Sequence, residues 1–194
     1  MNYQLNEIFY SLQGEGRWSG TPAHFIRLSG CNLKCTFCDT NHSHKLTLNE
    51  FGIVSELVNQ SLKCTRVVLT GGEPTLQDLN PLVDLLHMFD YSVHIETNGI
   101  TDPYLIFAKC DWITVSPKGV EAHWDQTDLV SEVKFLVGFP NCFPLIESYG
   151  DLKIPMYLQS VDNLKENINR VVDYCLAHPE YSLSMQVHKL IGVR

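Results

Sequence analysis

The chain has 194 residues, of which 44% are hydrophobic and 19% charged, a composition typical of one globular domain and unlike that of a disordered protein. The 22 acidic residues outnumber the 14 basic ones, and the net charge of -8 argues against a dedicated nucleic-acid-binding protein, because an acidic surface repels phosphate. No apolar run reaches the ~18 residues of a membrane span, and the first residues lack the pattern of a secretory signal. We therefore expect a soluble cytoplasmic protein that binds neither membrane nor nucleic acid.

Short β-like runs alternate with helical patterns in the first half of the chain, which is typical of an α/β protein. The run at 23–28 predicts a strand that ends just before Gly30. A capping box at Thr47–Glu50 predicts a helix that continues to about Val58. A strand is then predicted at 66–70, followed by a helix that carries Leu82, Leu85, Leu86 and Met88.

The alternation continues in the second half. Strands are predicted at 92–96, 111–115, 132–137, 155–159 and 183–187. A last helix is predicted from an apolar stripe that we expect to face the core, formed by Leu164, Ile168, Val171, Val172 and Cys175. Residues 119–131 and 139–153 show no clear periodicity, and we expect irregular insertions there.

Polar and glycine-rich residues gather where the predicted strands end. They stand at Cys31–Cys38, Thr70–Glu73, Glu96–Asn98, Ser116–Lys118 and Gln159. In parallel α/β folds the carboxyl ends of the strands lie on one face, and that face carries the active site. The sequence therefore predicts one site that several loops share.

Three thiols, Cys31, Cys35 and Cys38, fall within eight residues on a predicted loop. Thiolates favour iron–sulfur clusters, zinc or copper(I), and clustered thiols in a reducing compartment indicate metal binding or catalysis rather than disulfides. Three ligands would leave one iron of a 4Fe–4S cluster open to another molecule. A zinc site with three cysteines is the alternative, and its fourth ligand would be His42, His44 or Cys64.

The spacing of these cysteines, with Phe37 before the last one, resembles the signature of the radical S-adenosylmethionine (SAM) superfamily. Gly71–Pro74 after a strand resembles that superfamily's glycine-rich motif for the SAM amino group. Further motifs stand at Phe9–Gly16, Gly20, Arg27, Cys38–Thr40, Thr70–Pro74, Glu96–Gly99, Ser116–Lys118 and His188–Lys189. With these motifs nearly the whole chain resembles, more narrowly, the 7-carboxy-7-deazaguanine synthase family.

The resemblance implies a radical lyase reaction, in which 6-carboxy-5,6,7,8-tetrahydropterin contracts to 7-carboxy-7-deazaguanine with loss of ammonia. The cofactors would be a 4Fe–4S cluster on Cys31, Cys35 and Cys38, SAM, and a Mg²⁺ ion at Thr40. The catalytic residues would be these three cysteines and Arg27, which would also grip the substrate carboxylate. The resemblance further implies that Leu12, Gln13, Gly14, Glu15, Thr70, His188 and Arg194 bind substrate, and that Gly72, Glu73, Glu96, Ser116, Pro117, Lys118 and Gln159 bind SAM.

The implied architecture is one domain over residues 1–194, a partial, open (β/α) barrel of about six or seven mostly parallel strands. The implied partners are a flavodoxin-like or ferredoxin-like one-electron reductase and a second copy of the chain in a homodimer. The chain departs from the family pattern at Ser160, where proline is expected, and at Arg194, where proline is familiar. Two alternatives remain open, which are a glycyl-radical-enzyme activase and a non-catalytic metal or electron-transfer protein.

Overall fold

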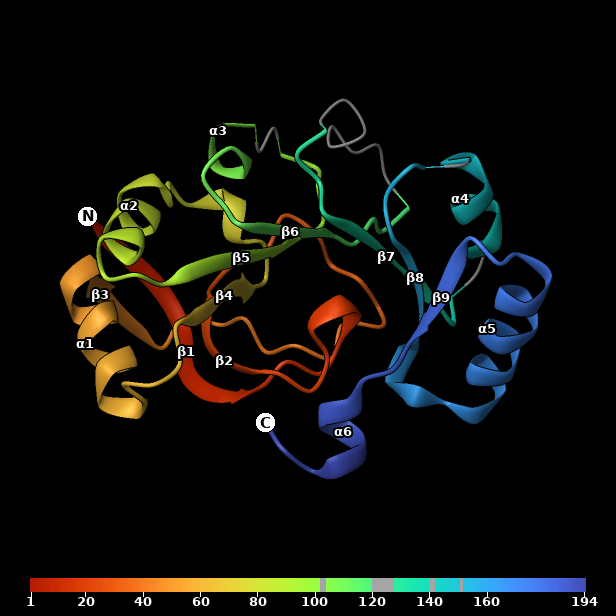
Figure 1. Ribbon diagram of the computed structural model, residues 1–194, viewed down its shortest axis with the longest axis horizontal. Helices are drawn as coiled ribbons and strands as arrows, with labels where there is room; N and C mark the ends of the chain where they lie inside the picture. The colour runs from red at the N-terminus through yellow and green to blue at the C-terminus, as the bar shows by residue number, and fades with distance from the viewer. Residues whose placement is uncertain (102–103, 120–127, 140–141, 151) are drawn as a thin grey trace.

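The computed structural model describes residues 1–101, 104–119, 128–139, 142–150 and 152–194. Its centre is one nine-stranded sheet in the order β3-β1-β2-β4-β5-β6-β7-β8-β9 (Figure 1). The strands are β1 (Asn2–Leu12), β2 (Pro22–Leu28), β3 (Leu46–Asn49), β4 (Arg66–Gly71), β5 (Ser92–Thr97), β6 (Trp112–Val115), β7 (Glu132–Val137), β8 (Met156–Ser160) and β9 (Tyr181–Ser184).

Seven strands, β2 and β4 to β9, pair in parallel. Strand β1 pairs antiparallel with both β2 and β3. Strands β3 and β9 end the order, so the described sheet curves but does not close (Figure 1). The predicted partial, open barrel of about six or seven mostly parallel strands is therefore confirmed. The sequence did not predict β1 and β3, the antiparallel strands at one edge.

Helices surround the outer face of the curved sheet, and α6 lies beside its open side (Figure 1). Their bounds are α1 Glu50–Gln60, α2 Asn80–Met88, α3 Tyr104–Phe107, α4 Cys142–Ser148, α5 Lys165–Ala177 and α6 Val187–Ile191, with 3₁₀ turns η1 at Gly16–Trp18, η2 at Pro74–Leu76 and η4 at Val161–Asn163. The larger hydrophobic cluster joins Leu57 and Leu82 of α1 and α2 to strand residues such as Ile26 and Leu69. No helix in the described part of the chain has the length and apolar character needed to span a membrane.

Two predictions about helices are wrong in detail. Thr47 lies in β3, and the cap of α1 is Asn49, whose side-chain oxygen accepts a hydrogen bond from the Gly52 amide at 2.8 Å. The region 139–153 contains α4, which sequence periodicity could not reveal because the helix is short and buries only Cys142 and Ile146. Residues 120–127, 140–141 and 151 of the two expected insertions lie outside the described residues.

The C-terminal elements also differ from their predicted form. In the stripe at 164–175, Val171 is fully buried but Leu164 and Val172 are exposed, so the stripe covers the core only in part. The last strand ends at Ser184 rather than at Val187. The side chain of Asn163 explains the early end, because it exchanges two hydrogen bonds with the backbone of Gln186, at 2.9 and 3.0 Å, and so occupies groups that a sheet partner would use.

An irregularity in β1 decides which of its side chains face the inside of the barrel. The register against β2 shifts between Leu5 and Glu7. Before the shift, Tyr3 and Leu5 pack in the core beneath the helices. After it, Phe9 packs in a second, inner cluster with Phe25 of β2. A one-residue bulge exchanges the two faces of a strand, and here it turns Glu7 and Phe9 toward the concave side.

Candidate active site

The strand ends that the sequence predicts to converge line one cavity of about 450 Å³. The cavity lies where β2, β4, β5, β6 and β8 end, and the segment after β1 and helix α6 complete its wall. The predicted site residues that line it are Leu12, Gln13, Gly14, Glu15, Arg27, Cys31, Cys35, Cys38, Thr40, Thr70, Gly72, Glu96, Ser116, Lys118, Gln159, His188 and Arg194. Among the predicted site residues, Glu73 and Pro117 do not line it.

The cysteine loop leaves the end of β2 and is held against the end of β4. Gly71 adopts φ +137°, and a Cβ on Gly72 would lie 1.9 Å from the carbonyl oxygen of Gly30. The amide of Glu73 donates to that same oxygen at 2.9 Å. Gly72 is therefore required because the loop that carries Cys31 touches the β4 loop without space for a side chain. Gly71 is required by its φ angle and by the backbone oxygen of Leu28 in β2, which would lie 2.2 Å from a Cβ.

The buried carboxylate of Glu73 organises the loops at the ends of β4 and β5. It accepts hydrogen bonds from the amide and hydroxyl of Thr75 at 3.1 and 2.7 Å, from Thr97 Oγ1 at 2.7 Å and from the Asn98 amide at 2.8 Å. Its side chain is completely buried. In this structure Glu73 thus joins two cavity loops from behind.

The residues predicted for substrate and for SAM meet at Glu96. Gln13 Nε2 donates to Glu96 Oε1 at 2.8 Å, and Thr70 Oγ1 donates to Glu96 Oε2 at 3.3 Å. The loop that holds Gln13 is fixed by α6, because the Val187 amide donates to the Gly14 carbonyl at 3.0 Å. A Cβ on Gly14 would lie only 1.9 Å from His188 Nδ1, so the imidazole rests directly on this glycine.

The family-model comparison matches the Radical SAM superfamily over residues 25–188. The chain is also 42% identical to the 7-carboxy-7-deazaguanine synthase of Bacteroides thetaiotaomicron, and the match covers all of both chains. The chain belongs to the 7-carboxy-7-deazaguanine synthase family. It is 36% identical to the Synechocystis synthase over 100% of this chain and 95% of that protein. It also resembles the crystal structure of QueE from Escherichia coli with a TM-score of 0.81 and 30% identity, over 97% of this chain and 95% of that one.

Membership of this radical SAM family implies a 4Fe–4S cluster and SAM, and the cysteine loop suits the cluster. The Leu33 amide points at Cys31 Sγ at 3.4 Å, and such N–H···S contacts stabilise ligating thiolates. Cys64, an alternative zinc ligand, lies at the opposite end of β4, where its Sγ faces the carbonyl oxygens of Pro22 and Arg66 at 3.6 and 3.7 Å. Within the described residues, no three His, Cys, Asp or Glu side chains, Cys31, Cys35 and Cys38 included, are grouped around a position for one metal ion.

A charged pair not anticipated from the sequence lies deep in the family's cavity. Lys134 of β7 is buried and forms an ion pair with Glu15, and Gln186 Nε2 donates to the same carboxylate at 3.0 Å. Burial opposes ionisation of Glu15, but the Lys134 charge lowers its pKa to about 2. Burial also opposes the charge of Lys134, yet the carboxylates of Glu15, Glu96 and Glu132 raise its pKa. Burial and the neighbouring Lys134 together lower the pKa of Lys118 to about 8.

Sequence reasoning missed several charged or polar residues of this cavity, namely Glu7, Asp39, Lys134, Gln186 and Lys189. Lys134 was visible as a cation within the otherwise apolar run Val133–Val137 of a buried strand, where a charge needs a partner or a function. Gln186 gave no local signal, and Lys189 belonged to the His188–Lys189 motif but received no role. Their position became clear only because both reach Asp39 beside the cysteine loop.

Proposed function

We propose that the chain converts 6-carboxy-5,6,7,8-tetrahydropterin to 7-carboxy-7-deazaguanine and ammonia. The observation that carries this proposal is the full-length similarity to synthases of that name, together with a cavity that Gln13, Glu15, Arg27 and the three cysteines share. The reaction is balanced, because ring contraction expels one nitrogen as ammonia and needs no net oxidant. Neither a glycyl-radical-enzyme activase nor a non-catalytic electron-transfer protein finds support among the relatives described above.

In the proposed arrangement Cys31, Cys35 and Cys38 hold the 4Fe–4S cluster and leave one iron open for SAM. When bound and reduced, this pair supplies a carbon-centred radical that can abstract a hydrogen atom. Gly72, Glu96, Ser116, Lys118 and Gln159 are proposed to position SAM. Glu96 also accepts hydrogen bonds from Gln13 and Thr70, and we infer that it fixes SAM and substrate relative to each other.

The substrate end of the cavity offers groups that match a carboxylated pterin. Glu15 is held ionised by Lys134 and can accept hydrogen bonds from the pterin N–H groups. Arg27 presents a planar fork suited to the carboxylate, and His188, Thr70, Leu12 and Gly14 complete the pterin contacts. Thr40 would donate one oxygen ligand to Mg²⁺, with substrate and water supplying the others.

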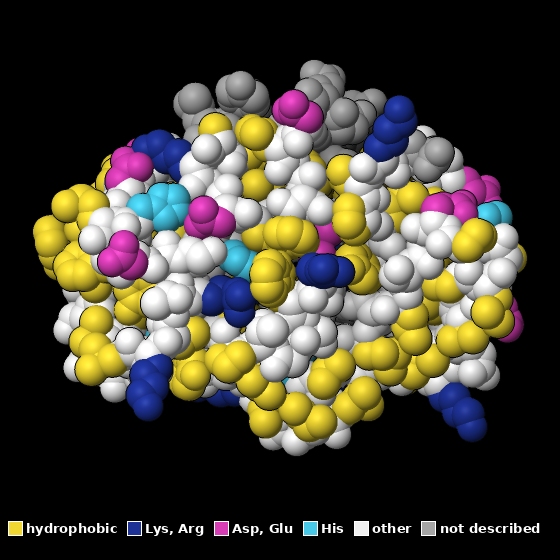
Figure 2. Space-filling model, in the orientation of Figure 1, with side chains coloured by type: hydrophobic (Ala, Val, Ile, Leu, Met, Phe, Trp, Pro, Cys, Tyr) yellow, Lys and Arg dark blue, Asp and Glu magenta, His cyan; other side chains and the backbone are white. Residues whose placement is uncertain are grey.

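We further propose a single cytoplasmic domain that forms a homodimer and receives electrons from a flavodoxin-like or ferredoxin-like protein. On the described part of the face in Figure 2, lysine and arginine side chains are scattered among other residues rather than gathered in one stripe. A scattered distribution agrees with a small-molecule enzyme and not with a nucleic-acid-binding surface.

The test is an anaerobic reaction of the iron- and sulfide-reconstituted protein with dithionite, SAM, Mg²⁺ and 6-carboxytetrahydropterin, followed by mass spectrometry. The expected products are 7-carboxy-7-deazaguanine and ammonia in equal amounts. These two account for every atom of the pterin, so the abstracted hydrogen must be returned and SAM regenerated, and 5'-deoxyadenosine should form only in turnovers that do not complete the reaction. Cleavage of SAM with the pterin untouched would contradict the substrate assignment but keep the radical SAM chemistry. Absence of both SAM cleavage and product in protein that carries a full cluster would contradict both.

A further inference from the structure

Glu7 is a carboxylate in the cavity wall for which the proposed reaction has no role. The bulge in β1 turns it toward the concave side, and its side chain remains 21% exposed. Placing a carboxylate here, in a pocket for a carboxylated substrate, is unfavourable unless positive charge surrounds it. The contacts of Glu7 provide that charge.

Glu7 bridges two arginines from opposite ends of the chain. Its Oε1 accepts a hydrogen bond from Arg27 Nε at 2.9 Å, and its Oε2 forms an ion pair with Arg194 Nη2. The Phe9 ring supports both guanidinium groups, whose central carbons lie 5.6 Å (Arg27) and 5.0 Å (Arg194) from its centroid. The main-chain oxygen of Arg194 is fixed as well, because it accepts a hydrogen bond from Ser11 Oγ at 2.6 Å.

The charges of this cluster decide what it can bind. Glu7 neutralises Arg27, so these two residues alone would offer no net charge to a carboxylate. Among these three side chains Arg194 adds the surplus positive charge, and it lines the same cavity. Because Glu7 occupies only the Nε of Arg27, both terminal amino groups of that guanidinium have no hydrogen-bond partner within the described residues. Those groups form the edge that binds a carboxylate in a bidentate manner.

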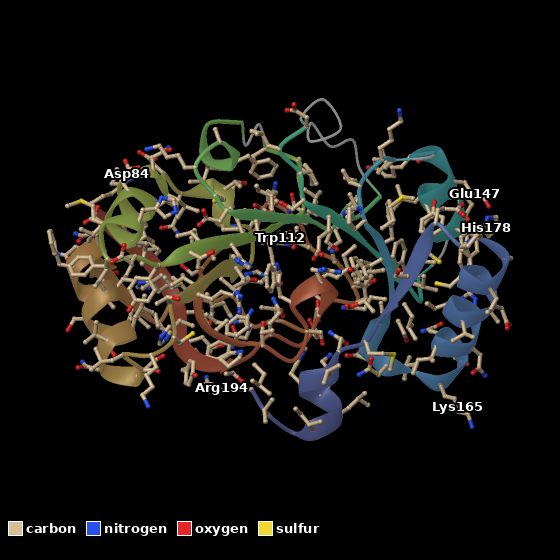
Figure 3. All side chains as sticks on the ribbon, viewed as in Figure 1. Asp84, Trp112, Glu147, Lys165, His178 and Arg194 are labelled. Atoms are coloured by element: carbon tan, nitrogen blue, oxygen red, sulfur yellow. The ribbon has the colours of Figure 1, made fainter. Side chains whose placement is uncertain are left out.

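We propose that the Arg194 guanidinium, which Glu7 holds beside Arg27 on the Phe9 ring, is a second recognition group for the substrate carboxylate, and that Glu7 is the residue that positions both arginines. The inference rests on the proposed function, which supplies a carboxylated substrate. It assigns the Arg194 side chain a role in substrate specificity. Figure 3 shows Arg194 beside the β1–β2 side of the molecule, far from Lys165 on α5.

The test compares two oxidised, unreactive pterins as probes, 6-carboxypterin and unsubstituted pterin. Their dissociation constants are measured by pterin fluorescence on the reconstituted holoenzyme with SAM and without reductant. Arg194→Gln should weaken binding of 6-carboxypterin by about fivefold, as expected for a partly exposed charge pair, and leave unsubstituted pterin within about twofold. Lys165→Gln, which removes an exposed positive charge remote from the cavity, should change neither constant.

A double-mutant cycle tests the positioning role of Glu7. If Glu7 holds Arg194 in place, Arg194→Gln should have an effect below about twofold in the Glu7→Gln background. Equal weakening of both probes by Arg194→Gln, or no weakening of either, would overturn the inference. An undiminished effect in the Glu7→Gln background would overturn the positioning role.

Turnover of 6-carboxytetrahydropterin by the unmodified enzyme separates this inference from the function it rests on. If the enzyme converts this substrate but Arg194→Gln binds 6-carboxypterin normally, only the role of Arg194 is wrong. If the enzyme does not convert it but Arg194→Gln still discriminates between the probes, carboxylate recognition stands and the proposed reaction is wrong.

Discussion

Lys134 and Glu15 form a buried ion pair across the floor of the cavity, although 119 residues separate them in the chain. Lys134 comes from β7 and Glu15 from the segment that follows β1, and four strands lie between β1 and β7 in the sheet order, so the pair spans the inside of the open barrel. Glu15 also accepts a hydrogen bond from Gln186, which in turn donates to Asp39 at 3.1 Å. Because Gln186 is neutral, the negative charge of Glu15 is stabilised mainly by Lys134.

Removal of that lysine should make catalysis sensitive to acid. In the unmodified enzyme the pKa of Glu15 is about 2, so the carboxylate stays ionised throughout the working range. In Lys134→Met, burial raises this pKa and only the hydrogen bonds from Gln159 and Gln186 oppose it, so kcat/KM should fall several-fold as the pH is lowered from 8 to 6. The measurement is the pH profile of kcat/KM for the pterin substrate.

Lys134→Arg is the matched control for that profile, because it keeps the positive charge beside Glu15. The kcat/KM of Lys134→Arg should fall no more steeply at low pH than that of the unmodified enzyme. Lys118 also faces this part of the cavity, and Lys134 helps to lower its pKa to about 8. Lys134→Met therefore raises the pKa of Lys118 away from the range between pH 6 and 8, whereas Lys134→Arg leaves it in place, so a new fall at acid pH in Lys134→Met reports Glu15. A profile of Lys134→Met that is parallel to that of the unmodified enzyme would show that Glu15 does not depend on the lysine.

The cysteine loop makes a prediction about metal content. Cys35→Ala should lose most bound iron after reconstitution and all detectable SAM cleavage, because a cluster with two protein ligands is poorly held. Cys64→Ala should retain iron and activity, since Cys64 lies at the other end of β4 against backbone carbonyls. Iron and sulfide analysis with SAM-cleavage assays would decide, and loss of metal from Cys64→Ala would favour the zinc alternative.

Sequence patterns predicted the parallel part of the sheet well because those strands are buried on both faces and form apolar runs, such as Val67–Leu69. They missed β1, an 11-residue strand whose bulge breaks the simple alternation of buried and exposed residues. The cavity residues at strand ends could be predicted from motifs. Glu7 and Gln186 could not, because their place in the cavity depends on a bulge and on the packing of α6. The His188–Lys189 motif was noted, but it did not show that the Lys189 side chain lies in the cavity wall.

The contact between the loops after β2 and β4 predicts an unequal effect of two glycine substitutions. Gly72→Ala places a Cβ 1.9 Å from the Gly30 oxygen, so the two loops must separate. Such overpacking costs roughly 1–3 kcal/mol and should lower Tm by about 3–10 °C while weakening SAM cleavage. In Gly52→Ala on α1, the nearest atom to the new Cβ lies at 3.3 Å and helix propensity improves, so Tm should remain or rise slightly. Calorimetry of the two variants checks this, and equal Tm values would contradict the contact.

Glu73 and Glu96 provide a last pair of opposed predictions, because one carboxylate lies behind the cavity loops and the other lines the cavity. Glu73→Gln would turn an amide N–H₂ toward groups that are themselves donors, among them the Asn98 amide. An unsatisfied buried donor costs about 1–3 kcal/mol, so Tm should fall by roughly 3–10 °C, and the KM for SAM should rise because the loops shift.

Glu96→Gln removes a charge at the cavity surface and leaves the loops in place. It should raise the KM for SAM by about tenfold or more with a Tm change of only a few degrees, as expected for a charged hydrogen bond to a ligand. Calorimetry and SAM-cleavage kinetics on the two variants separate the roles. If Glu73→Gln raised KM with an unchanged Tm, its carboxylate would contact SAM directly, and the loops would have to open on binding to expose a side chain that is now fully buried.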